Sequence, residues 1–266
     1  MSNTKAKKQL PVVVISPEAY GLPKEMDPMA QYVSRRGGGG LGDVTRGILQ
    51  GLHRLGNEVY YIGPNYKTIF KENAGLNHEE YIAKMKKTTR DRTLLVSSPH
   101  FTYLKQIYDG NVVKSAALLQ ELAIPHIKDI DRRHGGKTAT GKSIVHTQDQ
   151  FGGIIPAFCK SRNIPTVHTL HNGFTYLTPY DYYTNVDLTD GEWGLKKYMY
   201  EAPLGSNMID SHATAVKNAD IITFVGKRFY EEILEGRYKN WDIFASAQNT
   251  FKEVVIKAEH NQARVV

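Results

Sequence analysis

The chain has 266 residues, of which 41% are hydrophobic and 23% are charged, proportions that are ordinary for a globular protein with a buried core. No apolar run approaches the roughly 20 residues of a membrane span, and the polar first ten residues lack the apolar stretch of a signal peptide, so we expect a cytoplasmic protein without a membrane partner. The net charge of +7 is dispersed along the chain, which argues against a nucleic-acid partner.

The first predicted strand, Val12 to Ile15, follows a lead-in at 1–10 that we expect to be disordered. A long connection at 18–34, a candidate flap, leads to the glycine-rich stretch 35–43. Consecutive glycines let backbone N–H groups approach an anion, and the helix that follows adds free N–H groups and a positive dipole end. The stretch therefore predicts a phosphate-binding loop, and a tight turn that only joins strand to helix is the alternative.

An amphipathic helix follows the glycines. Asp43 is expected to be its N-cap, and Gly56 is expected to end it. The apolar positions share one helical face: Val44, Ile48, Leu49, Leu52 and Leu55. The loop fits neither the G-x-G-x-x-G fingerprint nor a Walker motif, so neither common nucleotide-binding motif accounts for it.

Short strands and helices fill the rest of the chain. In order, we predict a strand at 57–62, partly helical structure over 66–87, strands at 93–96 and 101–108, a helix at 112–122 and a basic loop at 131–142. From residue 143 onward, strands at 144–146, 166–170 and 221–225 alternate with helices at 154–160, 208–218 and 227–234, and a long helix is predicted at 241–261. The single cysteine, Cys159, is expected to be a core residue, since it cannot form an internal disulfide.

This alternation is typical of βαβ units, which build a mostly parallel sheet with helices on both faces. We therefore predict an α/β fold with a Rossmann-like, doubly wound sheet, formed as one domain over residues 11–266. In such sheets, ligands bind beyond the carboxyl ends of the strands. Residues that directly follow the predicted strands are thus candidates for a binding site.

Three predicted strand ends carry polar side chains. Glu18 follows the first strand, Asp149 follows 144–146, and His171 and Asn172 follow 166–170. We expect them to converge with the glycine loop over one cleft. The sequence leaves two alternatives open, because Asp149 could serve only as a helix N-cap and His171 could be a core histidine. No histidine pair has metal-ligand spacing, so no metal is expected.

Several motifs, in order, resemble those of bacterial glycogen and starch synthases. The run G-G-L-G-D at 39–43 is similar to the family's K-x-G-G-L-G-D, and V-H-T-Q-D at 145–149 with G-I-I-P-A at 153–157 is similar to V-H-x-H-D-W-x-x-G-x-x-P-A. The run I-P-T-V-H-T-L-H-N at 164–172 resembles I-P-x-V-x-T-I-H-N, and A-D-I-I-T-F-V at 219–225 resembles A-D-x-V-T-T-V.

The resemblance implies the amino-terminal half of a GT-B glucosyltransferase, an enzyme with two Rossmann-like halves. Such an enzyme transfers glucose from a nucleotide sugar, here expected to be ADP-glucose, to an α-glucan with retention of configuration and without a metal or a further cofactor. In this family, the second half supplies the groups that grip the donor. Nothing in the chain resembles that half, so we expect a second GT-B domain in cis or in trans.

The resemblance also implies roles for single residues. Asp149 and Asn172 would bind sugar hydroxyls, His171 would lie against the reacting glucose, and Glu18 would lie at the acceptor edge. On the phosphate side the implied residues are Gly39, Gly40 and Gly42, with Asp43 ordering the loop.

Departures from the family pattern support a second interpretation. The loop lysine falls on Gly37, and we expect Arg36 to take over its contact with phosphate. The second histidine of the V-H-x-H-D motif is Gln148, and the following tryptophan is Gln150. The lysine before the A-D strand falls on Ala213, or at best on nearby Lys217. The alternative is therefore a degenerate, non-catalytic module that binds glucan or a protein partner. A dinucleotide-dependent enzyme is a third interpretation, against which the missing fingerprint argues.

Overall fold

The computed structural model describes residues 10–23, 26, 40–87, 92–137, 141–172, 177–189, 194–201, 207–237 and 264–265. The predicted helix at 241–261 lies outside these ranges, and so does the predicted lead-in at 1–10 except for Leu10. The predicted flap at 18–34 is described only at 18–23 and 26.

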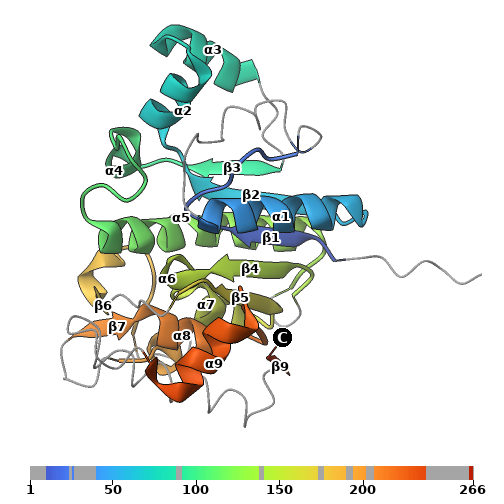
Figure 1. The fold of residues 1–266 in the computed structure, drawn as a ribbon, viewed down its shortest axis with the longest axis vertical. Coiled ribbons are helices and arrows are strands. Elements are labelled where there is room, and N and C mark those ends of the chain that lie inside the picture. Colours follow the sequence, from blue (N-terminus) through green and yellow to red (C-terminus); the bar gives the residue numbers. More distant parts are fainter. Residues whose placement is uncertain are drawn as a thin grey trace, which may run out of the picture.

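Seven parallel strands form the central sheet, which Figure 1 shows from β3 at the top downward. The strand order is β3-β2-β1-β4-β5-β8-β9. The strands are β1 (Val12–Ile15), β2 (Val59–Pro64), β3 (Thr93–Val96), β4 (Ile144–Gln148), β5 (Thr166–Leu170), β8 (Ile221–Phe224) and β9 (Arg264–Val265). The winding direction reverses between β1 and β4, as in doubly wound Rossmann-type sheets, and this confirms the predicted fold class.

Helices cover both faces of the sheet. In Figure 1, α1 (Gly40–Arg54) lies in front of the strands and α5 (Val112–Arg133) lies behind them. Because both faces are covered, β1 is apolar at every position and fully buried, as parallel strands usually are. Leu49 of α1 and Leu119 of α5 are completely buried in the same core, which also contains Cys159, as predicted.

Shorter elements surround this core. They are α2 (Lys67–Ala74), α3 (His78–Lys87), α4 (Pro99–Thr102), α6 (Asp149–Gly152), α7 (Ile155–Lys160), α8 (Ser211–Asn218), α9 (Lys227–Glu235), 3₁₀ turns at Tyr180–Tyr182 and Lys196–Tyr198, and an antiparallel pair of β6 (Leu177–Pro179) and β7 (Met208–Asp210). None of the helices in the described ranges has the length and apolar character needed to cross a membrane.

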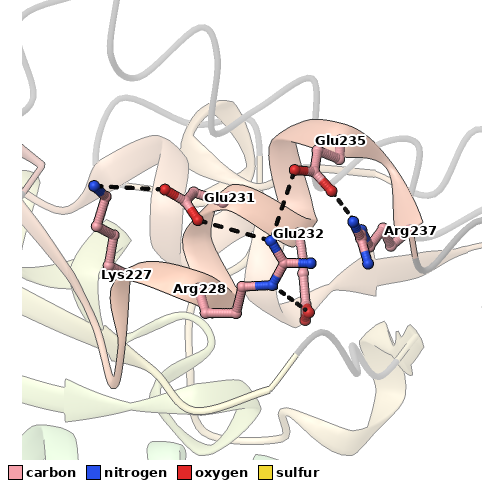
Figure 2. Close-up of polar contacts among 6 residues, drawn as sticks. All are labelled: Lys227, Arg228, Glu231, Glu232, Glu235 and Arg237. Carbon is pink, nitrogen blue, oxygen red and sulfur yellow. Dashed lines mark hydrogen bonds and ion pairs between the residues drawn. The ribbon is translucent and has the colours of Figure 1, made fainter.

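Helix α9 carries a ladder of charged side chains (Figure 2). Arg228 Nε lies 3.1 Å from Glu232 Oε1, and Lys227 Nζ lies 3.6 Å from Glu231 Oε1. Exposed pairs at this helical spacing each contribute only about 0.2–0.5 kcal/mol. The ladder is therefore a solvated helix face, with its charges paired along the helix.

The strand predicted at 101–108 is wrong. Residues 99–102 form α4, and a Ser-Pro pair explains why: the Ser98 hydroxyl accepts a hydrogen bond from the backbone N–H of His100 at 3.2 Å, and Pro99 occupies the first turn. A serine N-cap followed by proline is a helix start signal that overrides the β-like composition of the residues after it.

The N-cap predicted at Asp43 is also wrong, because α1 already begins at Gly40 and Asp43 lies exposed in its first turn. At the other end, Gly56 adopts a positive φ of 79° and its N–H donates to the carbonyl of His53, so it ends the helix as predicted. Leu55 does not share the buried face, since it follows the last helical residue and is 74% exposed.

Two other helices differ from the prediction by more than one residue at one end. Helix α5 continues past Leu122 through Pro125 to Arg133, so residues 131–133 of the predicted loop are helical. The predicted helix at 208–218 begins at Ser211, because the Asp210 side chain caps it by accepting from Ala213 N–H at 2.9 Å. The three residues before it pair with β6 instead.

Candidate functional site

A cavity of about 480 Å³ lies beyond the carboxyl ends of β1, β4 and β5, where the winding of the sheet reverses. It is lined by Glu18, Gly40, Leu41, Val44, Tyr108, Asp149, Gln150, His171, Asn172 and Val225. The position is the one at which open α/β sheets bind their ligands, and the volume is in the range of small-molecule sites.

Glu18 is a buried carboxylate held by two phenols. Tyr20 donates to one carboxylate oxygen at 2.6 Å and Tyr108 donates to the other at 2.8 Å. Tyr108 is 43% exposed, but its hydroxyl is shielded from water beside Glu18. This desolvation and the charge of Glu18 raise the pKa of the phenol far above its ordinary value, so Tyr108 remains a donor. The segment after β1 that carries Glu18 is held against α1 by a hydrogen bond, since Ser16 Oγ lies 2.9 Å from Thr45 Oγ1.

Asp149 lies at the sharp turn from β4 into α6. Its φ is +45°, a conformation that aspartate adopts more readily than most residues. Its Oδ1 accepts from the backbone N–H of His171 at 2.7 Å, and its Oδ2 accepts from Asn172 Nδ2 at 2.8 Å. Burial raises the pKa of Asp149 to about 7, and these hydrogen bonds oppose the shift.

His171 begins the loop after β5. Burial lowers the pKa of its imidazole to about 4, so the ring is neutral at physiological pH. Its Nε2 lies 2.6 Å from Oε1 of Gln148, the last residue of β4. The site thus holds one carboxyl group and one imidazole whose pKa values move in opposite directions, an arrangement common in functional sites.

Hydrogen bonds from helix α5 support the turn that carries Asp149. The side-chain amide of Gln120 on α5 donates to the carbonyl of Gln150 at 2.9 Å and accepts from Ile154 N–H at 3.1 Å. A side chain at Gly153 would collide with Gln120, since its Cβ would lie 2.2 Å from Oε1. The rigid α5 therefore fixes the turn that carries the carboxylate.

The structure brings five of the predicted site residues together on this cavity: Glu18, Gly40, Asp149, His171 and Asn172. The N-cap alternative for Asp149 does not hold in its simple form, because α6 begins at Asp149 and both carboxylate oxygens bond to the neighbouring loop. The predicted roles of these five residues toward a ligand stay predictions.

The remaining predicted residues lie elsewhere. Gly42 is buried against the ring of Tyr20, and Asp43 is exposed on α1, so neither lines the cavity. Arg36 and Gly39 lie outside the described residues. Two further lining residues were not predicted: Tyr108, because its segment was expected to be a strand, and Val225, which follows β8 and carries no polar group.

The cavity offers a carboxylate, an amide, a neutral imidazole and the first residue of α1, side by side with apolar walls. Such groups suit a ligand with many hydroxyls, and the first turn of a helix suits a phosphate. Within the described ranges, no three His, Cys, Asp or Glu side chains cluster so as to hold a metal ion.

A doubly wound parallel sheet with polar side chains gathered at its switch point defines a Rossmann-type ligand-binding domain. Comparison with known families narrows this class. The chain belongs to the starch synthase catalytic domain family, whose profile matches residues 11–243. The resemblance inferred from the motifs is thereby confirmed.

Among solved structures, the chain is similar to the catalytic domain of starch synthase IV from Arabidopsis thaliana, which was solved bound to ADP and acarbose. The match has a TM-score of 0.59 and 14% sequence identity, and it covers 93% of this chain. It confirms the fold as a Rossmann-like domain of a GT-B glycosyltransferase. The chain spans 50% of the length of that structure. No curated protein sequence gives a significant match.

Proposed function

We propose that this chain is the amino-terminal, acceptor-side domain of an α-glucan synthase, which transfers glucose from a nucleotide sugar to a glucan with retention of configuration. ADP-glucose is the proposed donor, and no metal or further cofactor takes part. The observation that carries the proposal is that Glu18, Asp149, His171 and Asn172 line one shared cavity in a member of the starch synthase catalytic domain family.

The chemistry follows from the groups on the cavity. Asp149, Asn172 and the neutral imidazole of His171 hydrogen-bond sugar hydroxyls and hold the glucose in one orientation. Gly40 opens α1 and lines the cavity, so the N–H groups of this helix end face the side on which a diphosphate leaves. Catalysis of this kind consists of positioning the reactants and stabilising the departing charge.

The donor-gripping groups are proposed to come from a second GT-B domain, in cis or in trans. The chain alone should then show no measurable transfer of glucose from ADP-glucose to glycogen, because misplacement of reacting groups by about 1 Å already lowers rates about a hundredfold. Turnover by the isolated chain would contradict this part of the proposal.

Binding tests the role of the chain itself. Titration calorimetry with maltotriose and, separately, with ADP should detect both ligands, and Arg36→Ala should weaken ADP binding by about 1.5–3 kcal/mol, the range for hydrogen bonds to charged groups. Arg35→Ala is the matched control and should leave ADP affinity near that of the wild type. Maltotriose affinity should be the same in all three chains, since neither arginine is assigned to the sugar.

The alternative is a non-catalytic module that binds glucan. The substitutions at Gly37, Gln148 and Gln150 relative to the family pattern favour it. The non-catalytic module becomes the better explanation if Arg36→Ala leaves ADP affinity unchanged while Gly37→Lys raises it. The phosphate site would then lack a positively charged side chain that binds phosphate.

A further inference from the structure

Gln148 contacts His171, the histidine that lines the cavity. It is the last residue of β4 and pairs in register with Thr169 of β5, and its side chain is completely buried. Its amide oxygen lies 2.6 Å from His171 Nε2, a short contact for two uncharged groups. The resembling family has a histidine at this position, so the amide is a distinctive feature of this chain.

The chemistry of the two groups decides which atom donates in the hydrogen bond between Gln148 and His171. An amide oxygen only accepts hydrogen bonds, and a neutral imidazole carries its proton on one nitrogen and a lone pair on the other. With the amide oxygen facing the ring, Nε2 is the protonated nitrogen and Nδ1 keeps the lone pair. Within the described part of the chain, Nδ1 has no hydrogen-bond partner.

Neighbouring residues fix both the main chain and the ring of His171. Asp149 Oδ1 holds its backbone N–H at 2.7 Å, and Gln148 holds its ring. The amide nitrogen of Gln148 is buried and makes no hydrogen bond to any described residue. A buried, unpaired donor is unfavourable, so the amide is poorly explained by packing and better explained by its contact with the imidazole.

We propose that Gln148 is a positioning residue that holds His171 in the tautomer protonated at Nε2, leaving Nδ1 as a hydrogen-bond acceptor at the cavity. The ligand group opposite Nδ1 must then be a donor, such as a sugar hydroxyl, and cannot be a phosphate or carboxylate oxygen. The identity of the sugar rests on the proposed function, whereas the tautomer does not.

The tautomer can be read by NMR on the full chain labelled with ¹⁵N-histidine, with His171→Asn used to assign the ring signals. At pH 7 the wild type should show a pyrrole-type Nε2 with a protected N–H proton, and a pyridine-type Nδ1. A pyrrole-type shift on Nδ1 of the wild type would overturn the proposal without the need for any variant.

Two variants separate positioning from packing. Gln148→Met keeps the side-chain length but removes the acceptor, so the protected N–H signal of His171 should disappear through exchange with water. Gln148→Glu restores an acceptor, so the signal should return, and the carboxylate should raise the pKa of His171 above that of the wild type.

Gln50→Met is the control, because Gln50 is a half-buried glutamine on α1 whose amide donates to the Gly21 carbonyl and does not contact His171. It should leave the His171 signals unchanged. If Gln50→Met abolishes the protected signal as Gln148→Met does, or if Gln148→Met retains it, then Gln148 has no specific role.

Addition of maltotriose separates this inference from the proposed function. A hydroxyl that donates to Nδ1 should move the Nδ1 resonance and leave the tautomer intact. If the tautomer is as proposed but maltotriose moves no His171 signal, the positioning role stands and the assignment of a sugar to this cavity is wrong.

Discussion

At the scale of single residues, the site holds groups that cost stability. Asp149 combines a positive φ with a carboxyl group that is almost completely buried. A strained backbone and a buried ionisable group both lower the stability of the folded chain. Such costs concentrate at functional sites, where a residue is selected for binding rather than for stability.

Asp149→Asn should therefore stabilise the chain at pH 8 while weakening the binding of maltotriose. The folded pKa of Asp149 is about 7 and its ordinary value is 3.8, so between these values the folded chain holds a proton that the unfolded chain has lost. Wild-type stability consequently falls as the pH rises from about 4 to about 7. The asparagine does not titrate, so its advantage should reach up to about 4 kcal/mol at pH 8.

Urea unfolding of both chains from pH 4 to pH 8 measures this difference. Asparagine is a suitable replacement because it tolerates a positive φ, and its amide can pair with Asn172 if that amide rotates. Asp43→Asn on the exposed surface of α1 is the control and should follow the wild type within about 0.5 kcal/mol. A difference between Asp149→Asn and the wild type that does not change with pH would show that the carboxyl group does not titrate as inferred.

Part of the site could be predicted at this scale because strand ends are visible in a sequence. The alternation of strands and helices placed Glu18, Asp149 and His171 beyond the carboxyl ends of parallel strands, and these ends meet at one edge. Tyr108 could not be found in this way. It reaches Glu18 across 90 positions of sequence, and only the path of the loop after α4 brings the two side chains together.

At the scale of elements, the close approach of α1 to the segment after β1 shapes the side of the cavity that carries Glu18. A Cβ at Gly42 would lie 2.4 Å from the ring of Tyr20, and Tyr20 N–H donates to the Gly42 carbonyl at 3.3 Å. The ring cannot withdraw freely, because its hydroxyl is bonded to Glu18. The glycine therefore lets the helix pack directly on the residue that holds the carboxylate.

Gly42→Ala should destabilise the chain by about 1–3 kcal/mol, the usual cost of overpacking. Gly51→Ala, on the same helix with no atom within 4 Å of the added Cβ, should instead stabilise it by about 0.5–1 kcal/mol through helix propensity. Chemical denaturation of both variants at pH 7 gives the comparison. Equal stabilisation by the two alanines would mean that Tyr20 can move and that Gly42 is not required for packing.

The elements themselves were predictable where periodicity and end signals agreed. Strand β5 was predicted with its observed bounds, because three of the five residues in Thr166–Leu170 are β-branched and the segment follows a proline. Helix α5 was predicted too short, since proline usually breaks a helix and Pro125 lies within its second half. Burial of eleven positions of α5 outweighs the one hydrogen bond that proline removes.

At the scale of the whole molecule, a layer of buried polar side chains joins the later strands. His146 Nε2 lies 2.6 Å from Thr169 Oγ1, which lies 2.7 Å from Thr223 Oγ1, so β4, β5 and β8 are linked. At the adjacent positions of β4 and β5, Thr147 Oγ1 lies 2.8 Å from His168 Nδ1. Burial lowers the pKa of both histidines, to about 4 for His146, so this layer is neutral in the folded chain at pH 7.

The global stability should therefore fall in acid, and His146→Gln should reduce that fall. Between pH 6.5 and about 4 the unfolded imidazole binds a proton that the folded one does not, so stability rises with pH through this window and is lost as pH falls. A shift of this size corresponds to about 3 kcal/mol at most.

Glutamine can place an amide near the position of Nε2, which preserves the contact with Thr169 without a titrating group. The opposing contribution of Asp149 is common to both chains and cancels in the difference. Unfolding free energies at pH 4.5 and pH 7 should thus differ less for His146→Gln than for the wild type, and an equal difference in the two chains would mean that His146 is not a source of the acid sensitivity.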